Sequence, residues 1–448
     1  MRRLLPAILP IMLLHSAIGF AQSSAAVAVS QQATASQGEL RLADIEKIAI
    51  DNNPTLRQAE ANIRVAQSRA KQAGLYPNPS VGVSGDEISG GPVIRGGQIG
   101  FFVQQDIVLG GKLGKSRRTA EQEVARIQAD AEAQKLKVLN TVRKLFYNTL
   151  GAQRKVEVRT RLYALVGDAV RTTKQLQNVG QADTPDLLEI EVEEQRADLA
   201  LIAARNELAQ LWQQLAASVG NPDLRPALLV GNFEEVPVID NESALNALLQ
   251  NSPEVKIAEA GIARAEATLT RAQVEKIPNI NVLGGLRYNR ELLEIGQKPV
   301  GWEGFFDVGI RIPLFDRNQG NVEAARAELN RAQREVDRVK LSLRSRLAAA
   351  YREFQNARDL AERYRKAMLP RAETAYDLYM TRFRQMAAAY PQALIAQRTL
   401  FQLQEDYSDV LSRMWTKAIE IQGMLLEGGL DAPGATRLEP ASSMENPR

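Results

Sequence analysis

The 448-residue sequence contains no cysteine, and its single histidine is His15. Without cysteine, the chain has no disulfide, no thiolate nucleophile and no cysteine that could carry a lipid. Histidine is the commonest general base, and histidine and cysteine are the preferred ligands of transition metals. A secreted hydrolase would have to rely on paired carboxylates, and no pair has a persuasive spacing. We therefore predict no catalytic residue, no metal site and no cofactor.

Long hydrophobic runs are also scarce. The one apolar run, residues 4–14, follows Arg2 and Arg3 and precedes small residues that end at Ala21. This pattern is typical of a secretory signal peptide, here residues 1–21. No other stretch approaches the roughly 18 consecutive apolar residues of a membrane-spanning helix. We expect an exported protein without a helical membrane anchor.

The charge is nearly balanced. Removing Arg2 and Arg3 with the signal peptide leaves 54 basic and 53 acidic residues. A nucleic-acid-binding protein needs basic residues clustered on one face. The sequence therefore does not predict a nucleic-acid partner.

The most regular stretch is residues 321–368, which contains no proline. One row of apolar or small residues recurs every seventh position, and a second row follows it three or four residues later. The first row is Val322, Leu329, Val336, Leu343, Ala350, Ala357 and Tyr364. This spacing predicts a long helix of the coiled-coil type, roughly 70 Å long, which must pack along other helices.

The same order of elements is expected twice, at an offset that aligns Pro54 with Pro253. The first repeat, residues 40–220, contains short helices, a β-hairpin (80–109), a long helix and a turn (179–185) before its last helix. In that turn, Thr184 is the expected N-cap. A linker (221–241) leads to the second repeat, residues 242–427, with a hairpin at 280–315 and a turn at 384–391. Residues 22–39 are predicted to be flexible, and residues 428–448 to form a disordered tail.

The hairpins decide between two kinds of protein. Their strands alternate apolar and polar residues over about ten positions, the length of a tilted membrane strand. Four strands cannot close a barrel, but two chains would supply eight and three chains twelve. The aromatic residues expected to form a membrane belt are Phe101, Phe102, Trp302, Phe305 and Phe306. The alternative is an ordinary sheet in a soluble domain, with some of these aromatic residues in its core.

Several motifs resemble those of the TolC-type outer-membrane efflux proteins. They are Asn53-Pro54, Pro77-Asn78-Pro79, the segment 105–112 after the second strand and the turn 180–188. The resemblance covers residues 40–427 and implies a homotrimer with a twelve-stranded barrel in outer-membrane lipid and a helical tunnel in the periplasm. Such proteins are exit ducts joined to an inner-membrane transporter through a periplasmic adaptor. Leu109 to Lys112, with Arg117-Arg118, resembles the branch that serves heavy-metal cation exporters.

The resemblance also implies site residues at the two turns. Three carboxylates, Asp183, Asp186 and Glu189, would form a cation-favouring ring at the tunnel mouth in a trimer, although they also complement the helix dipole. In relatives an aspartate pair narrows this aperture, and the aligned positions here are Gln392 and Ile395. The small residues expected at the adaptor-docking tips are Gly180, Ala182, Ala387, Ala388 and Ala389.

The sequence thus predicts a mainly α-helical protein with a β-barrel portion, acting as the passive exit duct of a tripartite efflux pump, with heavy-metal cations as candidate substrates. A type I secretion or drug-efflux duct of the same fold remains an alternative. A periplasmic coiled-coil adaptor is a further alternative, but it would need a small β-domain between its helices.

Overall fold

A computed structural model describes residues 38–87, 97–180, 182–292, 298–384 and 390–433. In the first half the helices and strands are β1 (Leu40–Arg41), α1 (Leu42–Asn52), α2 (Pro54–Ala73), β2 (Ser80–Asp86), β3 (Gln98–Ile107), α3 (Lys112–Asn178) and α4 (Thr184–Ser218). The remaining elements are β4 (Leu229–Val230), α5 (Asn241–Asn251), α6 (Pro253–Val274), β5 (Ile280–Leu292), β6 (Pro299–Ile310), α7 (Gln319–Arg363), η1 (Tyr364–Met368), α8 (Leu369–Arg384) and α9 (Tyr390–Gln422). The described part of the chain is therefore mainly helical, as predicted.

Prolines divide the short helices where the sequence indicated. Asn53 caps α2 by accepting a hydrogen bond from the Thr55 amide (2.9 Å), and Pro54 occupies the first helical position. Ser252 and Pro253 play the same parts for α6. Proline suits the first turn of a helix because its missing N–H would have no intrahelical partner there.

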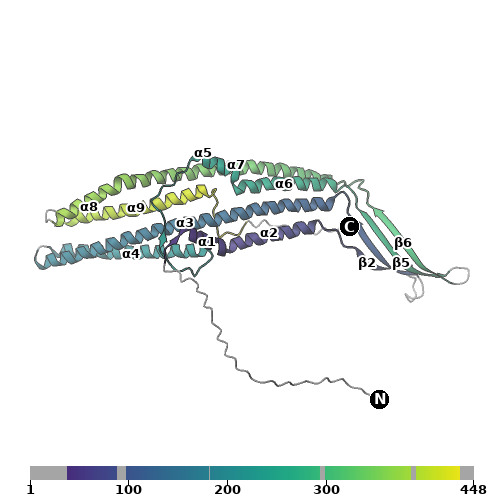
Figure 1. The fold of residues 1–448 in the computed structure, drawn as a ribbon, viewed down its shortest axis with the longest axis horizontal. Helices are drawn as coiled ribbons and strands as arrows, with labels where there is room; N and C mark the ends of the chain where they lie inside the picture. The colour runs from purple at the N-terminus through teal and green to yellow at the C-terminus, as the bar shows by residue number, and fades with distance from the viewer. Residues whose placement is uncertain (1–37, 88–96, 181, 293–297, 385–389, 434–448) are drawn as a thin grey trace, which may run out of the picture. The chain divides into compact units, whose positions relative to one another are not determined.

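Helix α3 packs against helices from both halves of the chain. It contacts α2 and α4 from its own half and α6 and α9 from the other half, and Figure 1 shows these helices side by side. Buried side chains along its length include Val142, Phe146 and Val166. A 67-residue helix extends roughly 100 Å at 1.5 Å per residue.

The long helix predicted to run from the heptad rows at 321–368 to the turn at 384–391 is interrupted within those rows. The first apolar row is largely buried from Val336 onward, but residues 364–368 form a π-turn, after which α8 carries the helix to Arg384. Pro370 explains the π-turn, because it has no N–H and its ring clashes with the carbonyl four residues earlier. In agreement, the Leu369 amide bonds the Tyr364 carbonyl five residues back.

The four longer strands form one antiparallel sheet in the order β2-β3-β5-β6. Among the described residues, β2 and β6 each pair with one strand only, so the sheet has two open edges. The second hairpin is shorter than predicted, since β6 ends at Ile310 and Pro313 cannot donate a ladder hydrogen bond.

Three further details differ from the sequence-based expectations. In the predicted linker, β4 pairs in parallel with β1. Residues 428–433 do not behave as the start of a tail: the Gly429 amide donates to Thr141 Oγ1 (3.1 Å) and its carbonyl accepts from Gln134 Nε2 (3.1 Å). Thr184 is the first residue of α4, and its N-cap is Asp183.

No described helix is long and apolar enough to cross a membrane.

Candidate functional site: the sheet faces and the helix turns

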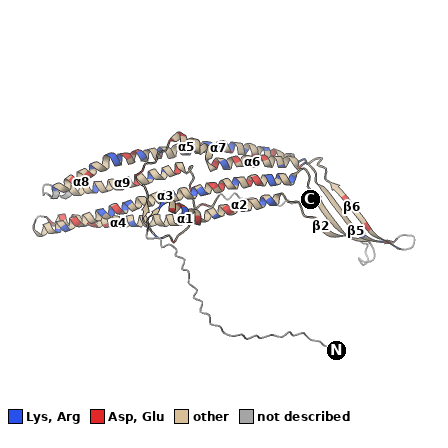
Figure 2. Cartoon of the chain, in the orientation of Figure 1, with Lys and Arg blue, Asp and Glu red and all other residues tan. Residues whose placement is uncertain are grey.

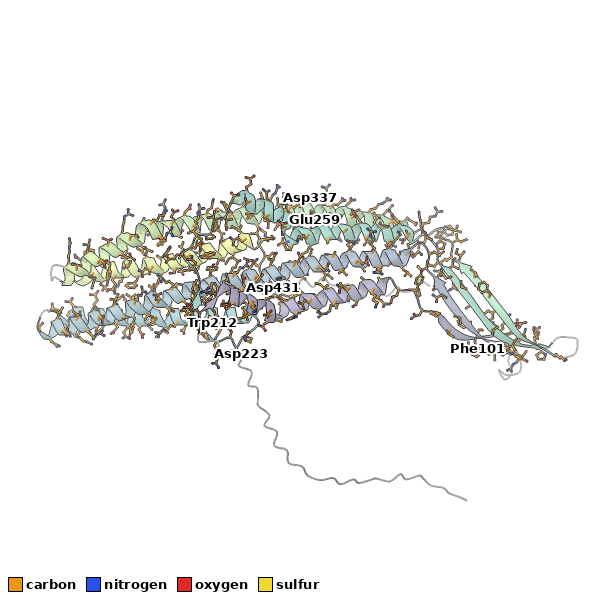
Figure 3. All side chains as sticks on the ribbon, in the orientation of Figure 1. Phe101, Trp212, Asp223, Glu259, Asp337 and Asp431 are labelled. Atoms are coloured by element: carbon orange, nitrogen blue, oxygen red, sulfur yellow. The ribbon has the colours of Figure 1, made fainter. Side chains whose placement is uncertain are left out.

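One face of the sheet is apolar and exposed. Paired residues of antiparallel strands point to the same face. Val83 pairs with Phe101, Phe101 with Leu286, and Gly284 with Phe306, so the apolar strand residues gather on one face of the sheet. Its exposed members are Val81, Val83, Phe101, Val103, Ile107, Leu286, Trp302, Phe306, Val308 and Ile310. Phe101 lies on the sheet away from the helices (Figure 3). An exposed apolar surface of this extent indicates contact with another apolar phase or partner.

The five aromatic residues expected in one membrane belt divide between the two faces. Phe101, Trp302 and Phe306 lie on the exposed apolar face, each more than 60% exposed. Phe102 and Phe305 lie on the opposite face, because they pair with Gly82 and Gly285, the positions between the apolar ones. A Cβ atom at Gly82 would lie 2.5 Å from the Phe102 ring, so glycine is needed beneath it.

The opposite face is polar and mainly acidic. Among its paired strand residues that the structure describes, it carries Asp86, Asp106, Glu303 and Asp307 and one basic residue, Arg287. Arg287 Nε donates to Glu303 Oε2 (3.3 Å), and its guanidinium lies 5.6 Å from the Phe305 ring centroid. The alternation predicted from the sequence therefore separates an apolar surface from an acidic one.

The first helix turn presents its carboxylates to solvent. Gly180 adopts a left-handed conformation (φ +72°) after α3, and Ala182 is half-buried. Asp183, Asp186 and Glu189 are all exposed at the start of α4, and none forms an ion pair with a described residue. Carboxylates at this position interact favourably with the positive end of the helix dipole.

The second turn is only partly visible. Gln392 and Ile395 are exposed near the start of α9, with Ile395 62% exposed. Ala387, Ala388 and Ala389 lie outside the described residues. The candidate aperture residues therefore lie at the start of α4 and near the start of α9. Among the described residues, no hydrogen bond or ion pair joins the two groups.

Ion pairs between α9 and the first half were not anticipated. Arg398 Nε donates to Glu193 Oε1 on α4 (2.9 Å), and Arg159 Nη2 on α3 donates to Oε2 of the buried Glu405 (2.5 Å). Burial raises the pKa of the Glu405 carboxyl, although Arg159 opposes this. Because Arg159 and Glu405 are 246 residues apart, no local pattern could have identified the pair.

A second polar network lies where the sheet meets the helices. Lys112, at the start of α3, is buried, and its Nζ lies 3.0 Å from Asn279 Oδ1 and 3.3 Å from Glu275 Oε1. Burial alone would raise the pKa of Glu275, but Arg271 and Lys112 lower it below its usual value. The network joins the two halves of the chain beside the sheet.

Among the residues that the structure describes, no group of three or more His, Cys, Asp or Glu side chains is arranged to hold a metal ion.

Comparisons with known proteins agree on one family. The family profile described as "Outer membrane efflux protein" matches residues 47–221 and 244–425. The cobalt-zinc-cadmium resistance protein CzcC of Cupriavidus metallidurans is 27% identical over 428 residues, which cover 91% of this chain and 97% of that protein. Protein CyaE of Bordetella pertussis is 25% identical over 336 residues, covering 71% of this chain and 70% of CyaE.

A solved structure gives the same fold. The structure of CusC, reported with conformational changes that accompany folding and transmembrane channel formation, superposes with a TM-score of 0.71. It is 17% identical, and the match covers 86% of this chain and 92% of CusC.

Proposed function

The chain belongs to the outer membrane efflux protein family, and from this premise we propose that three copies pool their strands into one twelve-stranded barrel. Members of the family are outer-membrane channels that extend into the periplasm and are not enzymes. The two halves, which repeat the order of two helices, two strands, a long helix and a further helix, are proposed to be structural repeats.

The observation that carries the barrel proposal is the four-stranded sheet with one apolar face and two open edges. An open strand edge is costly in lipid, because its N–H and C=O groups find no water. Closing β6 of one copy against β2 of the next would satisfy both edges, with the apolar face toward lipid. In this arrangement Phe101, Trp302 and Phe306 form the lipid-facing belt, and Phe102 and Phe305 line the lumen.

The duct conducts passively. The helices form the periplasmic tunnel, and energy comes from an inner-membrane transporter joined through a periplasmic adaptor. Gly180 and Ala182, together with the alanines at 387–389, form the tips on which the adaptor docks. The aperture lies at the exposed carboxylates Asp183, Asp186 and Glu189, beside Gln392 and Ile395, and three copies would favour cations.

Heavy-metal cations are the proposed substrates. Two observations support this: the similarity to CzcC extends over 97% of that resistance protein, and the polar face of the sheet has four carboxylates against one arginine. A lumen with excess negative charge raises the local concentration of cations. Secretion or drug-efflux ducts of the same fold are the rival functions.

The first test is assembly. Detergent-extracted protein should run, without heating, as a species of about three times the subunit mass, which collapses to the monomer on heating. Phe306→Arg should weaken this species, because an arginine facing lipid near mid-membrane costs about 2–4 kcal/mol per chain. Ser84→Arg, on the polar face, is the matched control and should leave it intact. A protein recovered as a monomer in the periplasmic fraction would reject the barrel.

The second test is substrate and aperture. Deleting the gene for this protein should lower the tolerance of the host cells to cobalt, zinc or cadmium and leave their tolerance to drugs unchanged. In planar bilayers, Asp186→Asn should reduce the preference for cations over anions. Loss of drug tolerance alone would reject heavy-metal cations as the substrates and favour the drug-efflux alternative.

A further inference from the structure

Four basic residues mark the four places where a strand meets a helix. We name the set Lys71, Arg118, Lys276 and Arg317 the junction girdle. Lys71 lies in the last turn of α2 before β2, and Arg118 in the second turn of α3 after β3. Lys276 lies between α6 and β5, and Arg317 between β6 and α7. All four side chains are exposed, and Lys and Arg appear in blue on the helices beside the sheet (Figure 2).

The girdle charges are not neutralised within the described chain. Two neighbouring basic residues have acidic partners: Lys112 forms an ion pair with Glu275, and Arg117 forms one with Glu121 (2.8 Å). None of the four girdle residues forms an ion pair with a described residue, and Arg317 only donates Nε to the Leu314 carbonyl (3.3 Å). The girdle therefore leaves four positive charges per chain available to an external anion.

Exposed apolar side chains lie beside the girdle. Tyr76, between Lys71 and β2, is 69% exposed, and Phe315, two residues before Arg317, is 91% exposed. Leu75, Ile312 and Leu314 are exposed in the same two segments. Aromatic residues flanked by lysine and arginine are typical of a membrane–water interface, where the ring sits at headgroup depth and the charge reaches the phosphate.

The length of the strands supports the same depth. At about 3.3 Å per residue, the ten residues of β3 extend roughly 33 Å, which matches an apolar band about 25 Å tall when the strand is tilted. The girdle lies just beyond the strand ends on the helical side. It would therefore reach the headgroups of the leaflet that faces the helices.

We propose that the junction girdle binds the phosphate groups of anionic phospholipids in that leaflet and so holds the barrel at a fixed depth. The proposal rests on the proposed function, because the girdle reaches this leaflet only if the sheet spans the membrane. Lysine and arginine near an anionic membrane surface each contribute up to about fivefold in affinity. Charge complementarity and the adjoining exposed aromatic residues favour lipid over a soluble anion.

The test is the lipid selectivity of the reconstituted full-length protein. The vesicles consist of phosphatidylcholine with about 20 mol% phosphatidylglycerol. They also contain a trace of spin-labelled phosphatidylglycerol or spin-labelled phosphatidylcholine. Electron paramagnetic resonance then gives the motionally restricted fraction of each lipid at the protein surface. The wild type should prefer phosphatidylglycerol several-fold. The quadruple variant K71Q/R118Q/K276Q/R317Q should fall to within about twofold of no preference.

A matched control removes the same charge elsewhere. Lys47, Arg205, Arg225 and Arg371 are exposed, form no ion pair with a described residue and lie on helices or loops away from the sheet. Changing these four to glutamine should leave the preference unchanged. An equal loss in both quadruple variants would overturn the proposal, as would a wild type without preference.

Two further outcomes have distinct meanings. Selectivity that is kept in chloride but lost in phosphate buffer of equal ionic strength would show that free phosphate competes for the girdle, and would support binding through the lipid phosphate. The absence of any restricted lipid component, for either label, would show that the protein does not enter the bilayer. That result would reject the proposed barrel itself, and it is distinguishable from a restricted component without selectivity.

Discussion

Removing Arg159 should destabilise the protein at neutral pH far more than at acid pH. Glu405 is buried, with its side chain 8% exposed, and Arg159 is its ion-pair partner, with Nη2 2.5 Å from Oε2. In Arg159→Ala the carboxylate would keep its buried position without its direct partner, although Lys155 would still favour its charged form. Breaking a buried pair in this way costs about 3–5 kcal/mol, because the remaining charge is left uncompensated.

The pH dependence follows from the direction of the pKa shift. The folded-state pKa of Glu405 lies above its usual value of 4.5, mainly because burial disfavours the charged form. A carboxyl with a raised folded-state pKa destabilises the fold as pH rises through that value, and it makes no such contribution below the unfolded-state pKa. Arg159→Ala should raise the pKa further, so its cost should shrink to about 1 kcal/mol at pH 4, where Glu405 is protonated in both states.

The assay is urea unfolding in detergent at about pH 4 and at about pH 7, monitored by circular dichroism. Urea is uncharged and does not screen the pair. Glu405→Gln is the control: it keeps the shape of the side chain but removes the titrating carboxyl, so its cost should be smaller and should not grow as the pH rises. If Arg159→Ala costs the same at both pH values, or nothing at pH 7, the buried pair does not stabilise the contact between α3 and α9 as argued.

Three other changes test the packing. Lys112→Met should lower the free energy of unfolding by about 1 kcal/mol in the same assay, because Glu275 is partly solvated and keeps Arg271 as a partner. A loss of about 3–5 kcal/mol, as for a broken buried pair, would contradict this. Pro370→Ala should convert the π-turn into regular α-helix and rotate α8. Hydrogen exchange should then show greater amide protection around residue 366, and unchanged protection would refute this. Phe354→Ala should lower the free energy of unfolding by about 3–5 kcal/mol, because Phe354 is fully buried. A loss below about 1 kcal/mol would show that the neighbouring side chains collapse into the cavity.

Much of the local structure was predictable because it depends on local signals. Proline and glycine mark the ends of α2 and α3, the heptad row predicts most of α7, and alternation predicts which residues of β3 share a face. Pro370 was a readable signal for the π-turn, but the long helix was predicted to run to the turn at 384–391 without an interruption. The aromatic residues Phe102 and Phe305 were assigned to the wrong set because aromatic character was counted without the strand parity that places them on the polar face.

The candidate site was less predictable. The exposed position of Asp183, Asp186 and Glu189 follows from a turn and a helix start, both of which are local. The pairing of Arg398 with Glu193 on α4 does not, because it joins residues 205 apart in the chain. The exposed Tyr76 and Phe315 beside the strands were missed, although Tyr76 directly precedes Pro77 and Phe315 follows Pro313 by two residues, which could have marked them as strand flanks.

The sequence by itself determined which segments are helices and strands, where most of them break and which strand residues alternate, because periodicity and backbone restrictions act within a few residues. Only the tertiary structure decided that α3 packs on helices of both halves, that Lys112 and Glu405 find partners across the chain, and that residues 428–433 pack against α3. These contacts depend on which surfaces meet in space. A chain of balanced charge with many interchangeable Arg, Lys and Glu residues does not encode those partners locally.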